Sequence, residues 1–128
     1  MINRKKVLVV DDEERVLNFV KIGLSHLGYE VVVTTSGEES LLLAESEKPD
    51  IMILDIVMSP LTGFDVLKKL RTFSVLPVVI CSSLQNISNL AREVGADGFI
   101  AKPFTTDKLA QKIVEIMEPQ TVQYSTGI

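Results

Sequence analysis

Four short polar segments carry residue types that could do chemistry, and each follows an apolar run. They are Asp11-Asp12, Asp55, Ser82-Ser83 and Lys102-Pro103. Three carboxylates that lie close together raise one another's pKa and oppose ionisation unless a cation joins them. Carboxylate oxygens are ligands that Mg²⁺ prefers, while a lysine ammonium and a serine hydroxyl suit phosphoryl oxygens. If the fold brings the four segments together, they predict a magnesium and phosphoryl site around Asp55.

Each segment taken alone also has an ordinary explanation. Acidic residues such as Asp12 are common at helix N-termini, where each contributes roughly 0.3–1 kcal/mol. A serine after a buried strand is usually a turn residue, and Lys-Pro is usually a surface turn. Asp55 is harder to explain in this way, because Ile56-Val57-Met58 follow it instead of turn residues. The chemistry therefore depends on whether the fold places these segments at one edge.

The apolar pattern predicts such a fold. Short β-branched segments alternate with helical patterns five times, which is typical of an α/β protein with a doubly wound parallel sheet. We expect strands at about 6–10, 30–34, 51–54, 77–81 and 98–101. The carboxyl ends of parallel strands meet at one edge of an open sheet, where ligands bind. The four polar segments close the first, third, fourth and fifth of these strands, so all four should lie at that edge.

The segments between the strands show the 3.6-residue period of helices that bury one face. The predicted buried stripes are Leu17, Val20, Leu24 and Leu27 in the first helix, Ile87, Leu90, Ala91 and Val94 in the fourth, and Leu109, Ile113 and Ile116 in the fifth. The predicted helix ends are capping boxes at Ser36 with Glu39 and at Thr62 with Asp65, and C-terminal caps at Gly28 and Gly95. We expect one domain over residues 1–118, followed by a flexible tail or truncated linker at 119–128.

The composition excludes several function classes. The 128 residues are 46% hydrophobic and 23% charged with a net charge of −4, which is typical of a globular protein and gives no reason to expect nucleic-acid binding. The apolar runs are about four residues long, against about 20 for a bilayer span, so we predict a cytoplasmic location and no membrane contact. A single cysteine, Cys81, excludes an internal disulfide and is most simply a buried small hydrophobe. His26 falls at the edge opposite Asp55, which excludes a triad hydrolase.

The motifs together resemble those of the receiver domains of two-component response regulators, over residues 5–117. The motifs that carry the resemblance are Val9 to Glu14, Ile53-Leu54-Asp55 with Met58 and Gly63, Pro77 to Ser82, and Gly95 to Phe104. The resemblance implies a flavodoxin-like (βα)5 fold with strand order 2-1-3-4-5, similar to chemotaxis regulators. It also implies a signalling switch that at most catalyses its own phosphorylation and slow dephosphorylation, rather than an enzyme.

The resemblance implies a reaction and a role for each site residue. Asp55 would take a phosphoryl group from the phosphohistidine of a sensor histidine kinase or phosphotransfer protein, with Mg²⁺ or Mn²⁺ as cofactor. Asp12 would be a direct metal ligand, Asp11 a ligand acting largely through water, and Val57 a ligand through its carbonyl, with Asp55 completing the set. Lys102 would bind the phosphoryl group. A carboxylate nucleophile suits such a transfer, because catalysis needs mainly positioning and charge neutralisation.

The resemblance also implies a switch. Ser82 matches the switch hydroxyl and Phe99 the switch aromatic, although an aromatic in a strand is also an ordinary core residue. The Lys102–Pro103 peptide bond would be cis, against about 5% of X-Pro bonds in general. A downstream effector would bind the face made by the helix around 87–94, strand 98–101 and the helix around 109–116.

Two features depart from the family or add to it. A proline commonly follows the methionine after the phosphoacceptor, but here Ser59 intervenes before Pro60, so we expect the loop beyond the site to differ. Val57 and Leu84 are apolar residues expected beside the phosphoryl pocket, where they would offer an attacking water no polar partner. We therefore expect a long-lived phosphorylated form.

Two other functions remain open from the sequence. A haloacid-dehalogenase-like phosphatase also uses an aspartate, a lysine and magnesium, but its nucleophile closes the first strand with a second acid two residues later. Here the first-strand acids Asp11 and Asp12 are adjacent, position 13 is Glu, and the chain is short for that fold. A receiver-like module that is never phosphorylated would keep the fold without the chemistry. The complete set of Asp12, Asp55, Ser82 and Lys102 favours the active receiver.

Overall fold

The computed structural model describes residues 4–118 and contains five strand–helix units in sequence order. The strands are β1 (Lys6–Val10), β2 (Glu30–Thr34), β3 (Ile51–Asp55), β4 (Val78–Ser82) and β5 (Gly98–Ala101). The helices are α1 (Glu14–His26), α2 (Gly37–Ser46), α3 (Gly63–Leu70), α4 (Ser88–Glu93) and α5 (Thr106–Met117). Every predicted strand is confirmed to within one residue at each end. The tail predicted at 119–128 lies outside the described residues.

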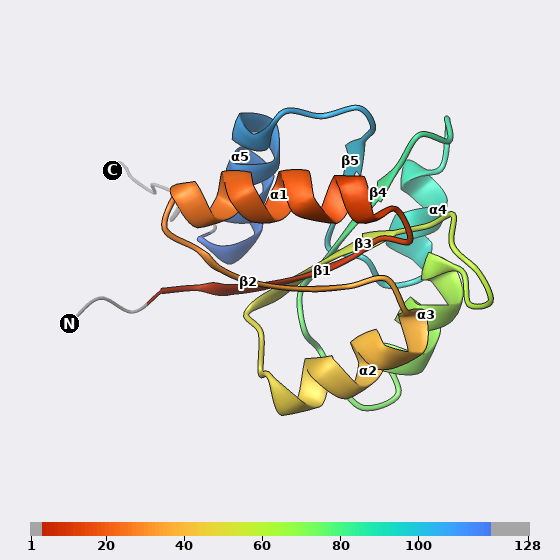
Figure 1. The fold of residues 1–128 in the computed structure, drawn as a ribbon. Helices are drawn as coiled ribbons and strands as arrows, with labels where there is room; N and C mark the ends of the chain where they lie inside the picture. The colour runs from red at the N-terminus through yellow and green to blue at the C-terminus, as the bar shows by residue number, and fades with distance from the viewer. Residues whose placement is uncertain (1–3, 119–128) are drawn as a thin grey trace, which may run out of the picture.

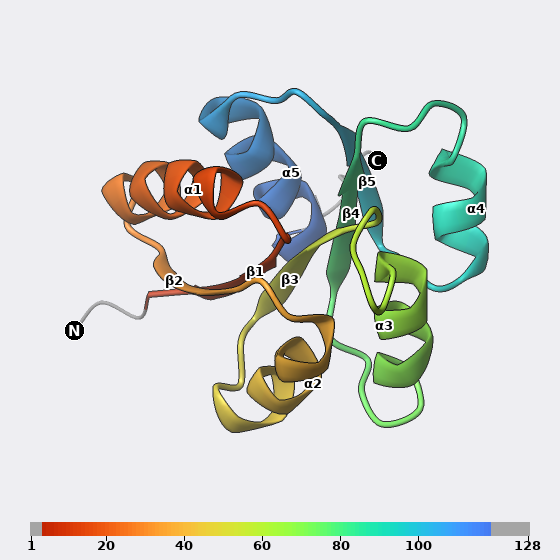
Figure 2. The same cartoon turned by 45° about the vertical axis from the view of Figure 1, so that its right-hand side comes forward.

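The five strands form one parallel sheet in the order β2-β1-β3-β4-β5, as predicted. Helices α1 and α5 cover one face and α2, α3 and α4 cover the other, so the sheet is doubly wound (Figures 1 and 2). The alternation of side chains along each strand supplies both faces with apolar groups. Val7 and Val9 of β1 join the core under α1 and α5, whereas Leu8 and Val10 join the core under α2, α3 and α4.

Strands β3 and β4 fix the position of Asp55 at the edge of the sheet. All residues of β3 and β4 are buried, which is expected of parallel strands covered on both faces. Pairing of Leu54 with Val10 and of Asp55 with Cys81 fixes the register of β1, β3 and β4. The carboxyl ends of these strands therefore lie side by side, with Asp55 closing β3.

The predicted helix ends are largely confirmed. The Thr62 hydroxyl accepts a hydrogen bond from the Asp65 N–H, and the Asp65 carboxylate accepts one from the Thr62 N–H, which completes a capping box at α3. Gly28 and Gly95 follow α1 and α4 with φ values of 99° and 100°, where a glycine is favoured.

The capping box at α2 is only half correct. Ser36 accepts from the Glu39 N–H as predicted, but the Glu39 carboxylate accepts from the Thr34 hydroxyl instead of the Ser36 N–H. The reciprocal bond is absent because the preceding strand places a competing donor within reach.

Two residues predicted in buried stripes are exposed. Leu27 is 48% exposed because α1 ends at His26, so that Leu27 forms the C-cap and leaves the helical stripe. Leu90 is 45% exposed because α4 has only six residues, of which Ala91 alone is fully buried. No helix among residues 4–118 is long and apolar enough to cross a membrane.

Candidate functional site

The carboxyl ends of β1, β3 and β5 bring three of the predicted site residues together. The Lys102 Nζ lies 2.8 Å from Asp11 Oδ2 and 3.4 Å from Asp55 Oδ2. Asp11 is 1% exposed and Asp55 4% exposed, so both carboxylates are removed from most of their water. The ammonium of Lys102 is thus shared between two buried carboxylates.

The charges in this cluster are not balanced, and the pKa values reflect this. Burial raises the pKa of Asp55 to about 6, the nearby Asp11 charge adds to the rise, and Lys102 and the Val57 N–H oppose it only in part. Burial lowers the pKa of Lys102, but its hydrogen bond to Asp11 and the two acidic charges outweigh burial and raise it overall. Lys102 therefore stays charged, and two carboxylates face one ammonium.

Asp12 occupies a different place from its neighbour. It is exposed and lines a solvent-open hollow of about 640 Å³, together with Asp55 and Lys102. The capping role considered for Asp12 is wrong, because Glu13 is the N-cap of α1 and its N–H donates to Asp11 Oδ1 at 2.9 Å. Asp11 thus lies deep in the cluster, while Asp12 remains free to face the hollow.

The loop after Asp55 is held close to it. A Cβ on Gly63 would lie 2.2 Å from the Asp55 backbone oxygen, so only glycine fits where α3 begins. The Gly63 N–H donates to the Ile56 carbonyl at 2.9 Å, which closes the loop onto the end of β3. Val57, the predicted carbonyl ligand, lines the hollow on this loop and is 55% exposed.

Two X-Pro bonds at this edge are cis. The Lys102–Pro103 bond is cis, as the family resemblance implied. The Ser59–Pro60 bond, in the loop that was expected to differ from the family, is also cis, which the sequence analysis did not predict.

Neither of the two predicted switch residues lines the first hollow. Ser82 is fully buried, and its Oγ accepts a hydrogen bond from the Leu84 N–H at 3.0 Å. Phe99 is half-buried, packs against the core under α3 and α4, and borders a second hollow of about 360 Å³. Ser83, rather than Ser82, lines the first hollow.

The sequence analysis missed the apolar walls of the first hollow. Val16, Phe19 and Phe104 line it beside the acidic residues. Phe19 is 50% exposed and falls two positions after Leu17, outside the buried stripe of α1. A large aromatic on the exposed face of a helix next to the predicted acidic edge was the signal that could have revealed this wall.

The donor set fits a hard divalent cation. Ligand atoms of Asp11, Asp55 and Cys81 lie within 4.8 Å of one another. Burial raises the pKa of the Cys81 thiol to about 12, so it is a neutral buried thiol, as predicted, and the oxygens are the effective donors. Two buried carboxylates with one ammonium leave a net negative charge, which Mg²⁺ with its preference for oxygen ligands would neutralise.

Comparisons with known proteins agree with this geometry. The sequence matches the family profile described as "Response regulator receiver domain" over residues 7–114. It is 36% identical to the "Probable transcriptional regulator ycf27" of Cyanophora paradoxa over 118 residues, which are 91% of this chain and 49% of that protein. It is 35% identical to the "Alkaline phosphatase synthesis transcriptional regulatory protein PhoP" of Bacillus subtilis over 116 residues, which are 88% of this chain and 48% of that protein.

Solved structures of response regulators have a similar fold. Chemotaxis response regulator CheY4 of Vibrio cholerae matches with a TM-score of 0.83 and 29% identity, covering 89% of this chain and 99% of that one. The Francisella response regulator 1452 receiver domain matches with a TM-score of 0.85 and 30% identity, covering 90% of this chain and 98% of that one. The chain spans about half the length of the curated relatives it matches.

Proposed function

Because the chain belongs to the response regulator receiver domain family, we propose that Asp55 is its phosphoacceptor and that Lys102, Asp11 and Asp12 prepare this carboxylate for the reaction. A receiver domain is a signalling module rather than a classical enzyme. The observation that carries the proposal is the position of Asp55, which is buried at the end of β3 yet lines an open hollow 3.4 Å from the Lys102 ammonium.

The reaction is a transfer of one phosphoryl group between two side chains. An ionised Asp55 oxygen attacks the phosphorus of a phosphohistidine as the bond from phosphorus to the imidazole nitrogen breaks. The imidazole leaves with the electron pair of that bond and takes a proton from solvent. With a pKa of about 6, Asp55 is mostly ionised at neutral pH, so no separate base is required.

Lys102 supplies the fixed positive charge for this step. Its ammonium already lies between Asp11 and Asp55, so it can neutralise charge on the phosphoryl oxygens without a large movement. Asp11, Asp12, Asp55 and the Val57 carbonyl would hold Mg²⁺ or Mn²⁺, and the bound ion would neutralise the remaining negative charge of the phosphoryl group and the carboxylates.

The switch begins at Ser82. Its hydroxyl oxygen holds the Leu84 N–H, so a rotation that brings the hydroxyl onto a phosphoryl group at Asp55 gives up this bond and frees the segment before α4. Phe99 borders the second hollow and has space beside it into which its ring can turn. The face made by α4, β5 and α5 would then differ between the two forms, and a downstream effector would bind it.

The phosphodonor must reach Asp55 through the first hollow, so its walls form the contact surface. Exposed Phe19 on α1, with Val16 and Phe104, offers an apolar surface beside the acidic residues. A sensor histidine kinase or phosphotransfer protein would bury these side chains while presenting its histidine. Two of the relatives are named as transcriptional regulators, yet nothing in this acidic domain favours nucleic acid, so DNA binding would belong to another domain. A cytoplasmic location remains a prediction.

Intact mass measured after incubation with acetyl phosphate and Mg²⁺ tests the proposal. We expect the wild-type protein to gain the mass of one phosphoryl group, and Asp55→Asn to gain none. Asp65→Asn is a matched control because Asp65 is exposed and caps α3 away from the hollow, so this variant should form the adduct. A folded wild-type protein without an adduct would favour the silent module, and continuous release of phosphate from many substrates would favour a phosphatase.

A further inference from the structure

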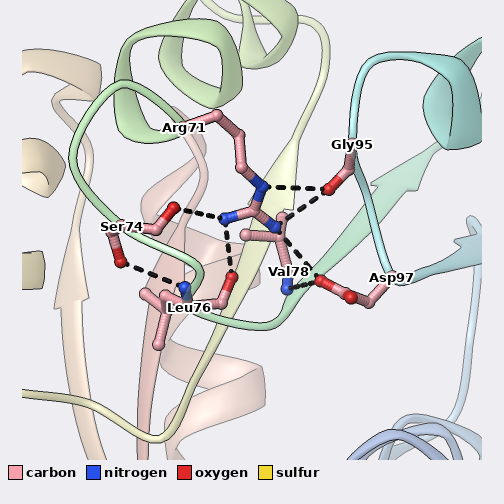
Figure 3. A network of polar contacts seen from close by, with 6 residues as sticks. All are labelled: Arg71, Ser74, Leu76, Val78, Gly95 and Asp97. Carbon is pink, nitrogen blue, oxygen red and sulfur yellow. Dashed lines mark hydrogen bonds and ion pairs between the residues drawn. The ribbon is translucent and has the colours of Figure 1, made fainter.

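A single guanidinium ties together two loops at the edge of the sheet opposite the phosphorylation site. Arg71 follows α3, and its Nε and Nη2 donate to the Gly95 carbonyl at 3.1 and 2.9 Å (Figure 3). Its Nη1 donates to the carbonyls of Leu76 at 2.8 Å and Ser74 at 3.3 Å. Its Nη2 also lies 3.1 Å from Asp97 Oδ2. One planar side chain thus connects the segment before β4 with the segment before β5.

Asp97 extends this network into the sheet. Its Oδ2 accepts from the Val78 N–H at 2.9 Å, and its own N–H donates to the Val78 carbonyl at 2.8 Å. Because Val78 opens β4 and Asp97 directly precedes β5, the network fixes the start of one strand against the start of the other. Each acceptor that the guanidinium engages is backbone or is itself bound to backbone, so this network differs from a mobile surface ion pair.

The two ends of α4 are held very differently. At the C-terminal end, the Ala96 N–H donates to the Ala91 carbonyl, and the Gly95 carbonyl accepts both bonds from Arg71. At the N-terminal end, the N-cap Ile87 makes no side-chain capping bond, and the preceding residues 83–86 are all exposed. The helix is therefore tied to Arg71 just beyond its C-terminal end. Its N-terminal end has no side-chain cap and is held by the packing of Ile87 and by the helix's own backbone bonds.

This asymmetry gives Arg71 a role in the switch. We propose that Arg71 is a positioning residue that pins the C-terminal end of α4 and the start of β5, so that movement after phosphorylation is confined to the N-terminal end of α4 and to Phe99. The proposal rests on the proposed function of Asp55. Phe99 lies two residues beyond Asp97, so the same network holds the backbone that carries the switch aromatic. A helix fixed at one end can hinge about that end, so its other end can move while the fixed end stays in place.

Amide hydrogen exchange of the full chain tests this proposal, with and without acetyl phosphate and Mg²⁺, and with intact mass recorded for every sample. In the wild-type protein we expect phosphorylation to change exchange over residues 84–90 and to leave residues 95–97 unchanged. In Arg71→Gln we expect exchange at 95–97 to be at least about 10-fold faster and to become dependent on phosphorylation. Arg71→Lys, which keeps the charge but not the planar group, should give an intermediate effect.

Arg15→Gln is the matched control, because Arg15 is an exposed arginine on α1 that lies outside the network and lines neither hollow. This variant should behave as the wild type. Equal acceleration at 95–97 in both forms of Arg71→Gln would show a purely structural role and overturn the proposal, as would no acceleration. If Arg71→Gln does not fold, amide exchange at residues 95–97 is measured in Asp97→Asn, with and without phosphorylation, and the same outcomes support or overturn the proposal. A wild-type protein that forms no adduct would overturn the proposed function, and this proposal with it.

Discussion

Replacing Asp55 with asparagine should stabilise the metal-free protein at neutral pH, although it removes the proposed phosphoacceptor. The pKa of Asp55 is about 6 in the folded protein and 3.8 without the fold. One pKa unit corresponds to 1.36 kcal/mol, so the ionised carboxylate costs the fold at most about 3 kcal/mol. We expect a gain of about 1–2 kcal/mol, because a buried asparagine amide also loses hydration.

The gain in stability from Asp55→Asn should depend on pH. The folded protein binds the Asp55 proton more tightly than the unfolded chain, so this group's contribution to stability is complete below pH 3.8 and is lost as the pH rises through about 6. Wild type and Asp55→Asn should therefore differ most near pH 8 and converge at about pH 4. Urea unfolding with a chelator present, at several pH values, measures the difference.

Adding Mg²⁺ should reverse the order of the two proteins. A cation that binds only the folded wild type stabilises it by mass action, and Asp55→Asn should gain less. Asp12→Asn separates the effects: because Asp12 is exposed, its replacement should not stabilise the metal-free protein, yet it should reduce the gain from Mg²⁺. The reasoning is refuted if Asp55→Asn is no more stable than wild type at pH 8, or if the difference does not change with pH.

Three further predictions concern the same edge of the sheet. Gly63→Ala should cost about 3 kcal/mol in urea unfolding, because its Cβ would lie 2.2 Å from the Asp55 oxygen, whereas Gly28→Ala, with open space around it, should cost about 1 kcal/mol; equal costs would contradict this. Lys102→Met should destabilise the metal-free protein by about 3 kcal/mol, and Mg²⁺ should recover part of the loss; no loss would mean that the carboxylates do not depend on Lys102. Val57→Asn should shorten the lifetime of the phosphorylated form several-fold in timed mass measurements, because the new amide offers an attacking water a polar partner in the hollow. Leu84→Asn should have a smaller effect, because Leu84 does not line the hollow.

The fold could be predicted because local and long-range signals agree. The strands were found to within one residue, since β3 and β4 are buried on both faces and therefore read as short apolar runs. The errors concern residues whose burial depends on where a helix ends and on what packs against it. Leu27 fits the helical period of α1 but lies past the end of that helix. Leu90 fits the period of α4, but this short helix buries only Ala91. Periodicity shows which residues could share a face, but not how far the helix continues.

The grouping of Asp11, Asp55 and Lys102 at one edge was predictable, but how deeply each carboxylate is buried was not. Asp55 and Lys102 could be predicted because each closes a predicted strand, and the topology of a parallel sheet brings those strand ends to one edge. The different positions of Asp11 and Asp12 could not be read from two adjacent acids, since they depend on where β1 ends and α1 begins. The Arg71 network was missed because most of its acceptors are backbone carbonyls, which leave no trace in residue type. Such contacts depend on the conformation of the loops before β4 and β5, which residue type alone does not specify.

The two edges of the sheet differ in how well their charges are balanced, and in the proposed switch this difference would let a phosphoryl group on Asp55 move α4 without disturbing the sheet. At the N-terminal edge, Arg71 and its acceptors are mutually satisfied and hold neighbouring strands in place. At the carboxyl edge, Asp11 and Asp55 share one ammonium and leave charge unbalanced. The central strands are packed on both faces and cannot shift singly. In the proposed switch, a change of charge at Asp55 would therefore be taken up by the loops that follow the strands. The exposed segment 83–86 leads directly into the end of α4 that has no side-chain cap.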